Sequence, residues 1–65
     1  MSLIINMIYE LIDTRTNEVL FTGNIIQIEK KSGIARTRLM WSYTEQVKII
    51  NDKYIVKKKE KNNEN

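Results

Sequence analysis

Two short segments near the start of the chain have the composition of β-strands. Residues 7–13 and residues 18–22 are rich in β-branched and aromatic side chains, which favour extended backbone. Asp13 and Asn17 bound the segment between them, and both residue types form tight turns readily. The pattern therefore predicts a β-hairpin with a short loop. The residues expected to face a common core are Tyr9, Leu11, Val19 and Phe21.

The polar and apolar positions change to a helical spacing after the hairpin. Asn24 and Gln27 have the spacing of a capping box, with Asn in place of Ser or Thr, so a helix is expected to begin here. This first helix covers residues 25–32, and its buried face carries Ile25 and Ile28.

A second helix is predicted close behind the first. Gly33 is expected to end the first helix in the left-handed conformation, and Ile34 supplies the apolar contact that often follows such an end. The second helical segment covers residues 35–43, so the connection is as tight as a helix-turn-helix requires. One side of this helix carries Ala35, Leu39, Ser42 and Tyr43. The other side carries Arg36, Thr37, Met40 and Trp41.

The segment after the helices has two readings. Residues 47–57 form either two short strands around a turn at Asn51 and Asp52, or a single strand over residues 53–58 that joins the N-terminal hairpin. In both cases the sequence predicts one α+β domain over residues 1–58, in the order hairpin, two helices, then a C-terminal strand or small hairpin. Residues 59–65 contain no apolar side chain and are expected to form a disordered tail.

The composition excludes several classes of enzyme. The 65-residue chain has no cysteine and no histidine, so it lacks the usual zinc ligands, the thiol nucleophile and the commonest general base. None of its carboxylates has a supporting base in the sequence pattern. We therefore expect a non-enzymatic protein that needs no cofactor or metal, and cytoplasm is the default location.

The charge of the chain is unevenly distributed. Residues 1–29 carry a net charge of −3, whereas residues 30–61 contain ten basic and three acidic residues, a net charge of +7. A basic half on a small domain is typical of proteins that bind polyanions, although solubility alone accounts for it equally well. Enrichment in Ile, Lys and Asn fits an AT-rich genome such as that of a phage.

The order of these elements resembles two groups of DNA-binding proteins. Over residues 7–58, the hairpin, the Gly-Asn helix start, Gly33 with Ile34, the second helix and the segment Ile-Asn-Asp-Lys-Tyr at residues 50–54 are similar to small phage-type helix-turn-helix proteins. They are also similar to the modular DNA-binding domains associated with homing endonucleases. The resemblance implies a recognition helix in the major groove. Its matching positions are Ala35, Arg36, Thr37, Met40 and Trp41.

The chain departs from that family pattern at the turn between the helices. The family usually has a small residue where this chain has Glu29, an apolar residue at Ser32 and a Ser or Thr cap at Ala35. Because a long carboxylate would hold the helices apart, we expect the Glu29 side chain to turn outward.

Basic side chains make the second helix the expected DNA-binding element. Arg36 and Arg38 begin this helix, where a docked recognition helix presents its N-terminal residues to bases and phosphates. Lysines at the end of the first helix and in the C-terminal strand are expected to contact phosphates. The candidate residues for binding double-stranded DNA are Lys30, Lys31, Arg36, Thr37, Arg38, Met40, Trp41, Lys57 and Lys58.

The single tryptophan leaves an alternative open. Trp41 could stack on a base or anchor a protein partner, but we expect it to pack in the core beneath the C-terminal strand. The alternative function is a protein-interaction module, such as a phage-encoded inhibitor or adaptor of a host protein. A third possibility is a homodimer that pairs an apolar edge strand over residues 3–8, which would not compete with DNA binding.

Overall fold

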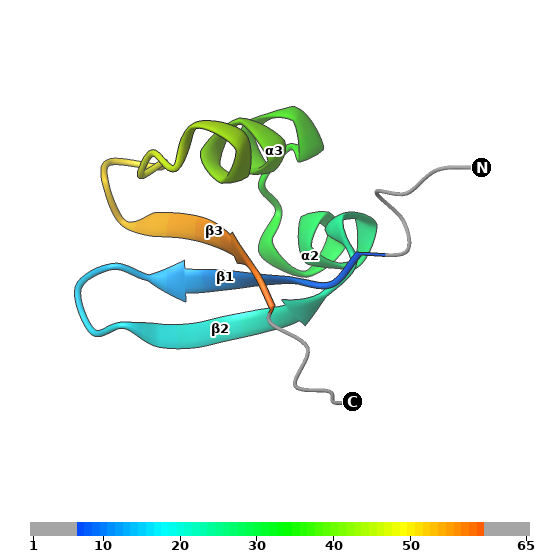
Figure 1. Ribbon diagram of the computed structural model, residues 1–65, viewed down its shortest axis with the longest axis horizontal. Coiled ribbons are helices and arrows are strands. Elements are labelled where there is room, and N and C mark those ends of the chain that lie inside the picture. Colours follow the sequence, from blue (N-terminus) through cyan, green and yellow to red (C-terminus); the bar gives the residue numbers. More distant parts are fainter. Residues whose placement is uncertain (1–6, 60–65) are drawn as a thin grey trace.

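The computed structural model describes residues 7–59 and contains three strands and two helices. The elements are β1 (Tyr9–Asp13), β2 (Glu18–Gly23), α2 (Ile25–Ser32), α3 (Arg36–Glu45) and β3 (Tyr54–Lys58) (Figure 1). This order confirms the predicted α+β fold. Most of the predicted polar tail, from residue 60 onward, and residues 3–6 of the predicted edge strand lie outside the described residues. Met7 and Ile8 precede β1 and belong to no strand.

The three strands form one antiparallel sheet with β1 at its centre. β2 and β3 pair with β1 on opposite sides, so the sheet order is β2-β1-β3. Of the two readings of the C-terminal segment, the single strand that joins the hairpin is correct. Only an isolated bridge between Ile49 and Tyr54 lies where a second hairpin was expected. The turn before β3 passes through Ile50, Asn51 and Asp52, whose φ angles are 55°, 58° and 63°.

The hairpin pairing is irregular at Leu20. Leu11 pairs with Phe21, whereas Ile12 pairs with Val19, so Leu20 has no partner on β1. An extra residue of this kind interrupts the alternation of side chains between the two faces of a strand. Phe21 packs against the core as predicted, but Val19 is 44% exposed. The prediction that Val19 faces the core is therefore wrong, because the irregularity changes its register.

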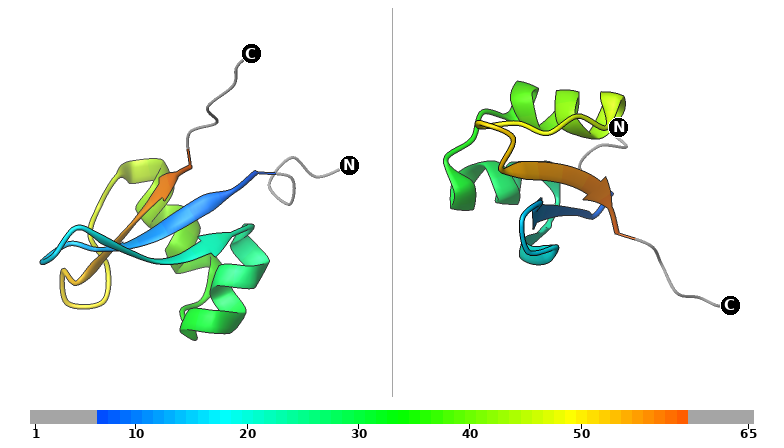
Figure 2. Two further views of the ribbon diagram at one scale, coloured as in Figure 1. Left: turned by 90° about the horizontal axis from the view of Figure 1, so that it is seen from below. Right: turned by 90° about the vertical axis from the view of Figure 1, so that its left-hand side faces the viewer.

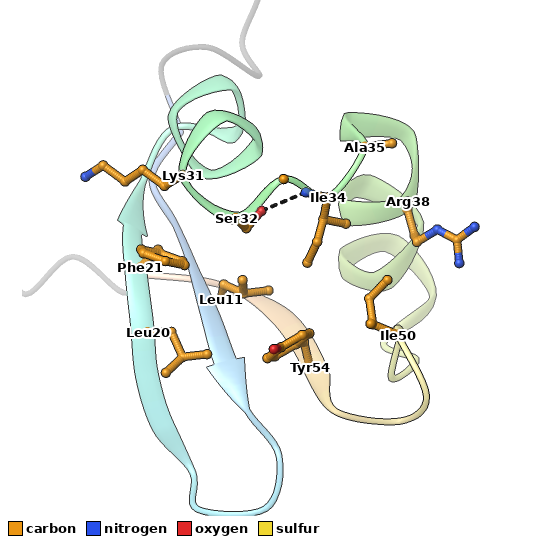
Figure 3. Close-up of a pocket in the computed structure, with 11 residues that line it drawn as sticks. Leu11, Leu20, Phe21, Lys31, Ser32, Ile34, Ala35, Arg38, Ile50 and Tyr54 are labelled. Carbon is orange, nitrogen blue, oxygen red and sulfur yellow. Dashed lines mark hydrogen bonds between the residues drawn. The ribbon is translucent and has the colours of Figure 1, made fainter.

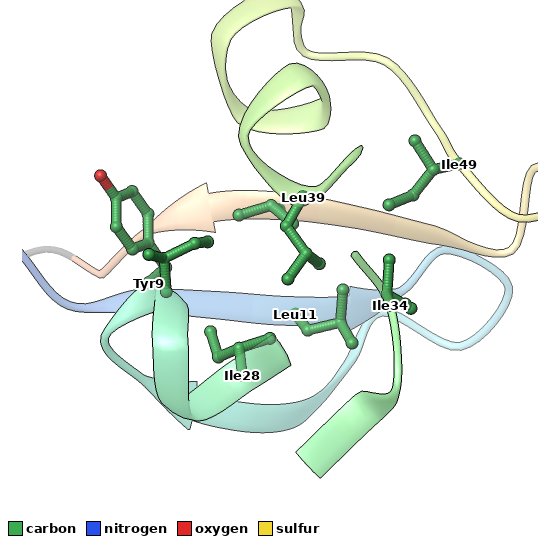
Figure 4. Close-up of a cluster of buried hydrophobic side chains, with 8 residues drawn as sticks. Tyr9, Leu11, Ile28, Ile34, Leu39 and Ile49 are labelled. Carbon is green, nitrogen blue, oxygen red and sulfur yellow. The ribbon is translucent and has the colours of Figure 1, made fainter. Parts of the chain in front are cut away.

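Both helices cover the same face of the sheet, and the core lies between them and the strands (Figure 2). The buried apolar side chains are Tyr9, Leu11, Ile25, Ile28, Ile34, Leu39, Ile49 and Val56, several of which Figure 4 shows together. The Tyr9 ring meets the Tyr43 ring edge-on, with centroids 5.0 Å apart. Burial, and to a lesser extent the neighbouring Tyr43, raises the pKa of the Tyr9 hydroxyl above 10.0.

The C-terminal end of α3 covers the outer edge of β3. The buried Ser42 hydroxyl donates to the Val47 carbonyl at 2.7 Å and accepts the Val56 N–H at 3.0 Å. The Gln46 side-chain amide donates to the Val56 carbonyl at 3.2 Å. These bonds satisfy backbone groups that an edge strand otherwise leaves open. At the other edge of the sheet, β2 pairs only with β1 within the described residues.

Candidate nucleic-acid interface

The predicted capping box fixes the start of α2. The Asn24 side-chain oxygen accepts the Gln27 N–H at 2.9 Å, and the Gln27 side-chain oxygen accepts the Asn24 N–H at 2.9 Å. These reciprocal bonds satisfy two backbone donors at the helix N-terminus. The first helix is therefore positioned by residues that the sequence pattern identified correctly.

The connection between the helices also has the predicted form. Gly33 adopts φ 77°, in the left-handed region, and its N–H donates to the Glu29 carbonyl at 2.9 Å. Ile34 is buried, and its N–H donates to the Ser32 hydroxyl at 3.1 Å. Only residues 33–35 separate α2 from α3. This short connection holds the N-terminal turn of α3 next to the C-terminal turn of α2.

Glu29 caps the N-terminus of α3 from the neighbouring helix. Ala35 has no side chain that could cap α3, and the Arg36 N–H instead donates to Glu29 Oε2 at 3.1 Å. Glu29 Oε1 also lies 3.3 Å from Arg36 Nε. The Glu29 side chain therefore does not turn outward as expected but reaches the N-terminus of α3, where the positive end of the helix dipole stabilises its charge. Sequence reasoning missed this contact, although the absence of a cap at Ala35 was a signal for it.

The outer face of α3 presents Thr37, Arg38 and Trp41 to solvent. Leu39 and Ser42 are fully buried on the opposite face, as predicted. Trp41 is 51% exposed, so the expectation that it packs in the core is wrong. The reason is the phase of the helix, because β3 contacts the side of α3 that carries Ser42 and not the side that carries Trp41. Met40 is half-buried and packs against the core, which leaves it less available to a partner.

Four cationic side chains lie near this face. Lys30 and Lys31 are exposed in the last turn of α2, and Arg36 and Arg38 are exposed in the first turn of α3. Lys31 and Arg38 border the same groove from different sides, so each of the two helices carries an exposed cation at its rim. We call the exposed members of this set the helix-pair surface: Lys30, Lys31, Arg36, Thr37, Arg38 and Trp41.

The two remaining candidates lie apart from the helix-pair surface. Lys57 and Lys58 are exposed near the end of β3 and border a shallow hollow beside Tyr43 and Gln46, at the C-terminal end of α3. Since α3 rises about 1.5 Å per residue, this end lies roughly 13 Å from Arg36 along the helix. Lys57 is also the cross-strand partner of Glu10, whose charge opposes its own. Lys57 and Lys58 are therefore not part of the helix-pair surface.

Comparisons with known proteins give no relative for this chain. No protein-family model matches it, and neither a curated protein nor a solved structure does so. Within residues 7–59, no helix is long and apolar enough to cross a membrane. The same part of the chain contains no group of three or more acidic, His or Cys side chains placed to hold a metal ion.

Proposed function

We propose that this protein is a non-enzymatic module that binds double-stranded DNA through the outer face of α3. The observation that carries the proposal is the helix-pair surface, where four exposed cations lie in the last turn of α2 and the first turn of α3, and α3 also presents Thr37 and Trp41 to solvent. The neighbouring carboxylate of Glu29 is engaged by Arg36. A basic helix face beside a tight interhelical turn has the chemistry needed to enter a major groove.

The residues of this surface would make different contacts with DNA. Arg38 has no ion-pair partner within the described residues, so its guanidinium is free to donate two hydrogen bonds to a guanine edge. Lys30 and Lys31 would contact phosphates and release counterions, which gives affinity without reading sequence. Lys57 and Lys58 lie on β3 beside the C-terminal end of α3, so they would reach only flanking phosphates.

The ion pair with Glu29 makes Arg36 the weaker candidate for base contacts. Its guanidinium must leave a carboxylate that also caps α3 before it can bind a base. Arg38 has no such competition and also lies on the exposed side of the helix. We therefore expect Arg38 to contribute more to DNA affinity than Arg36.

Fluorescence anisotropy with a labelled mixed-sequence duplex tests this assignment. Arg38→Ala is expected to weaken binding about tenfold, as loss of a phosphate or bidentate base contact does. The matched control is Arg15→Ala, which removes the same charge from the hairpin loop, where the side chain is 67% exposed and pairs with Asp13. Equal losses for the two variants would show that only net charge matters and would contradict the role assigned to α3.

A second function is supported by the exposure of Trp41. An aromatic side chain with half of its surface open to solvent is a common anchor in protein interfaces. In this alternative, the helix-pair surface binds a host protein and the chain acts as an inhibitor or adaptor. A folded protein that binds no duplex at low salt, but loses a protein partner on Trp41→Ala, would favour this alternative.

A further inference from the structure

A groove opens between the helix connection and the sheet, on the side of β2 (Figure 3). It encloses a volume of about 670 Å³. Its apolar wall is formed by Leu11, Leu20, Phe21, Ile34, Ile50 and Tyr54. These side chains come from all three strands, from the helix connection and from the turn before β3, so the groove exists only in the folded chain.

Two backbone irregularities contribute apolar side chains to this groove. Leu20 is the residue without a partner on β1, and it is 37% exposed. Ile50 has a φ of 55°, a left-handed conformation that β-branched residues rarely adopt. Bulges and unusual backbone conformations are often retained where they direct a side chain toward a binding site. Both features here place large apolar groups beside solvent.

The rim of the groove is positively charged. Lys31 on α2 and Arg38 on α3 border it from different sides, and both side chains are exposed. Among residues 7–59, no acidic side chain lines it. An apolar surface with cations on two sides complements a ligand that carries a bulky apolar group flanked by carboxylates.

We propose that this groove binds an acidic peptide segment of another protein, which inserts one aromatic or aliphatic side chain against Phe21 and Ile34. Carboxylates on either side of that anchor would pair with Lys31 and Arg38. A peptide fits better than a compact metabolite because the groove is open and borders β2, an edge strand that pairs only with β1 within the described residues. This inference does not depend on DNA binding, which uses the outer face of α3.

The probe is a fluorescein-labelled peptide of sequence Asp-Glu-Phe-Leu-Glu-Asp, titrated by anisotropy in the absence of DNA. Two altered peptides separate the contributions: one replaces Phe and Leu by Ser, and the other replaces the acidic residues by Asn and Gln. Each alteration is expected to weaken binding at least fivefold. Binding that survives either alteration would overturn the proposal, because the groove requires both the anchor and the charge.

Variants of the protein locate the site. Lys31→Glu with Arg38→Glu is expected to weaken binding about tenfold, since two screened attractions become repulsions. The matched control reverses Lys48 and Lys59, which are exposed and do not line the groove. Similar losses for the two double variants would overturn the proposal.

A matched pair of variants tests the apolar wall of the groove. Leu20→Ser removes an exposed side chain that lines the groove, whereas Val19→Ser removes a similarly exposed one that does not. Only the first substitution is expected to reduce peptide affinity, by about threefold to tenfold. Amide shifts on peptide addition, followed by NMR, should centre on Leu20, Ile34 and Ile50. Shifts centred on Val19 and Ile12 instead would contradict the assigned site.

Discussion

Ser42 shows how one small polar side chain joins a helix to a sheet. Its hydroxyl is completely buried, donates to the carbonyl of Val47 and accepts the N–H of Val56. A buried backbone group that loses its partner destabilises a fold by more than an average hydrogen bond contributes. Ser42 therefore holds α3 against β3 and orients the exposed face of the helix.

Ser42→Ala is predicted to destabilise the protein by about 1–3 kcal/mol, because the Val56 N–H and the Val47 carbonyl lose their partner. Urea denaturation followed by circular dichroism measures the change. Thr44→Ala, an exposed position on the same helix, serves as the control and should change the free energy of unfolding by no more than about 0.5 kcal/mol. Equal effects at the two positions would contradict this role.

Asp13 makes the stability of the hairpin depend on pH. Its carboxylate accepts the Arg15 N–H at 2.8 Å, and this bond holds the pKa of Asp13 below 3.8 despite opposing desolvation. A lowered pKa in the folded state means that the stabilisation is complete above the unfolded pKa and is lost as the pH falls through the folded pKa.

Unfolding midpoints measured in urea from pH 6 to pH 2 should therefore decline below about pH 4. In Asp13→Asn, which keeps an acceptor oxygen but does not titrate, the decline should be smaller. A variant with the same acid dependence as the parent protein would show that other carboxylates control it.

At the scale of elements, Glu29 links the two helices. Its carboxylate belongs to α2, caps the first N–H of α3 and pairs with the guanidinium of Arg36. It therefore stabilises the helix pair and at the same time competes with an anion for Arg36.

Glu29→Gln is predicted to have opposite effects on stability and binding. The loss of the charged cap should lower the free energy of unfolding by about 0.5–1 kcal/mol. Release of Arg36 should raise duplex affinity about threefold to tenfold at low salt. Glu45→Gln, at the exposed far end of α3, is the control for the change in net charge. Weaker DNA binding by Glu29→Gln would contradict the competition inferred from the ion pair.

Elements were easier to predict than the contacts between them. The capping box at Asn24 and the left-handed Gly33 are set by neighbouring residues, so their spacing in the sequence located α2 and the start of the turn. The exposure of Val19 depends on the irregular pairing with β1, and that of Trp41 depends on where β3 packs. The Glu29 cap depends on two helices meeting. These features arise from tertiary contacts that no local pattern contains.

At the scale of the whole molecule, the sheet and its core support two adjacent surfaces. The helix-pair surface is basic and carries the exposed Trp41, whereas the groove is apolar with Lys31 and Arg38 at its rim. Arg38 belongs to both surfaces. An acidic peptide in the groove would therefore reduce the charge available to DNA, and the two proposals can be measured separately because each has its own probe.

The salt dependence of duplex binding tests the central proposal most directly. In anisotropy titrations from about 50 to 200 mM salt, the logarithm of the association constant should fall linearly with the logarithm of the salt concentration. The slope should be about −0.9 for each phosphate contacted. At each salt concentration, a double variant, Arg36→Ala with Arg38→Ala, should bind the duplex at least about tenfold more weakly than the parent protein, because the base contact of Arg38 is lost. Absence of binding by the folded protein at about 50 mM salt, or an unchanged affinity in the double variant, would contradict the assignment of α3 as the DNA-binding element.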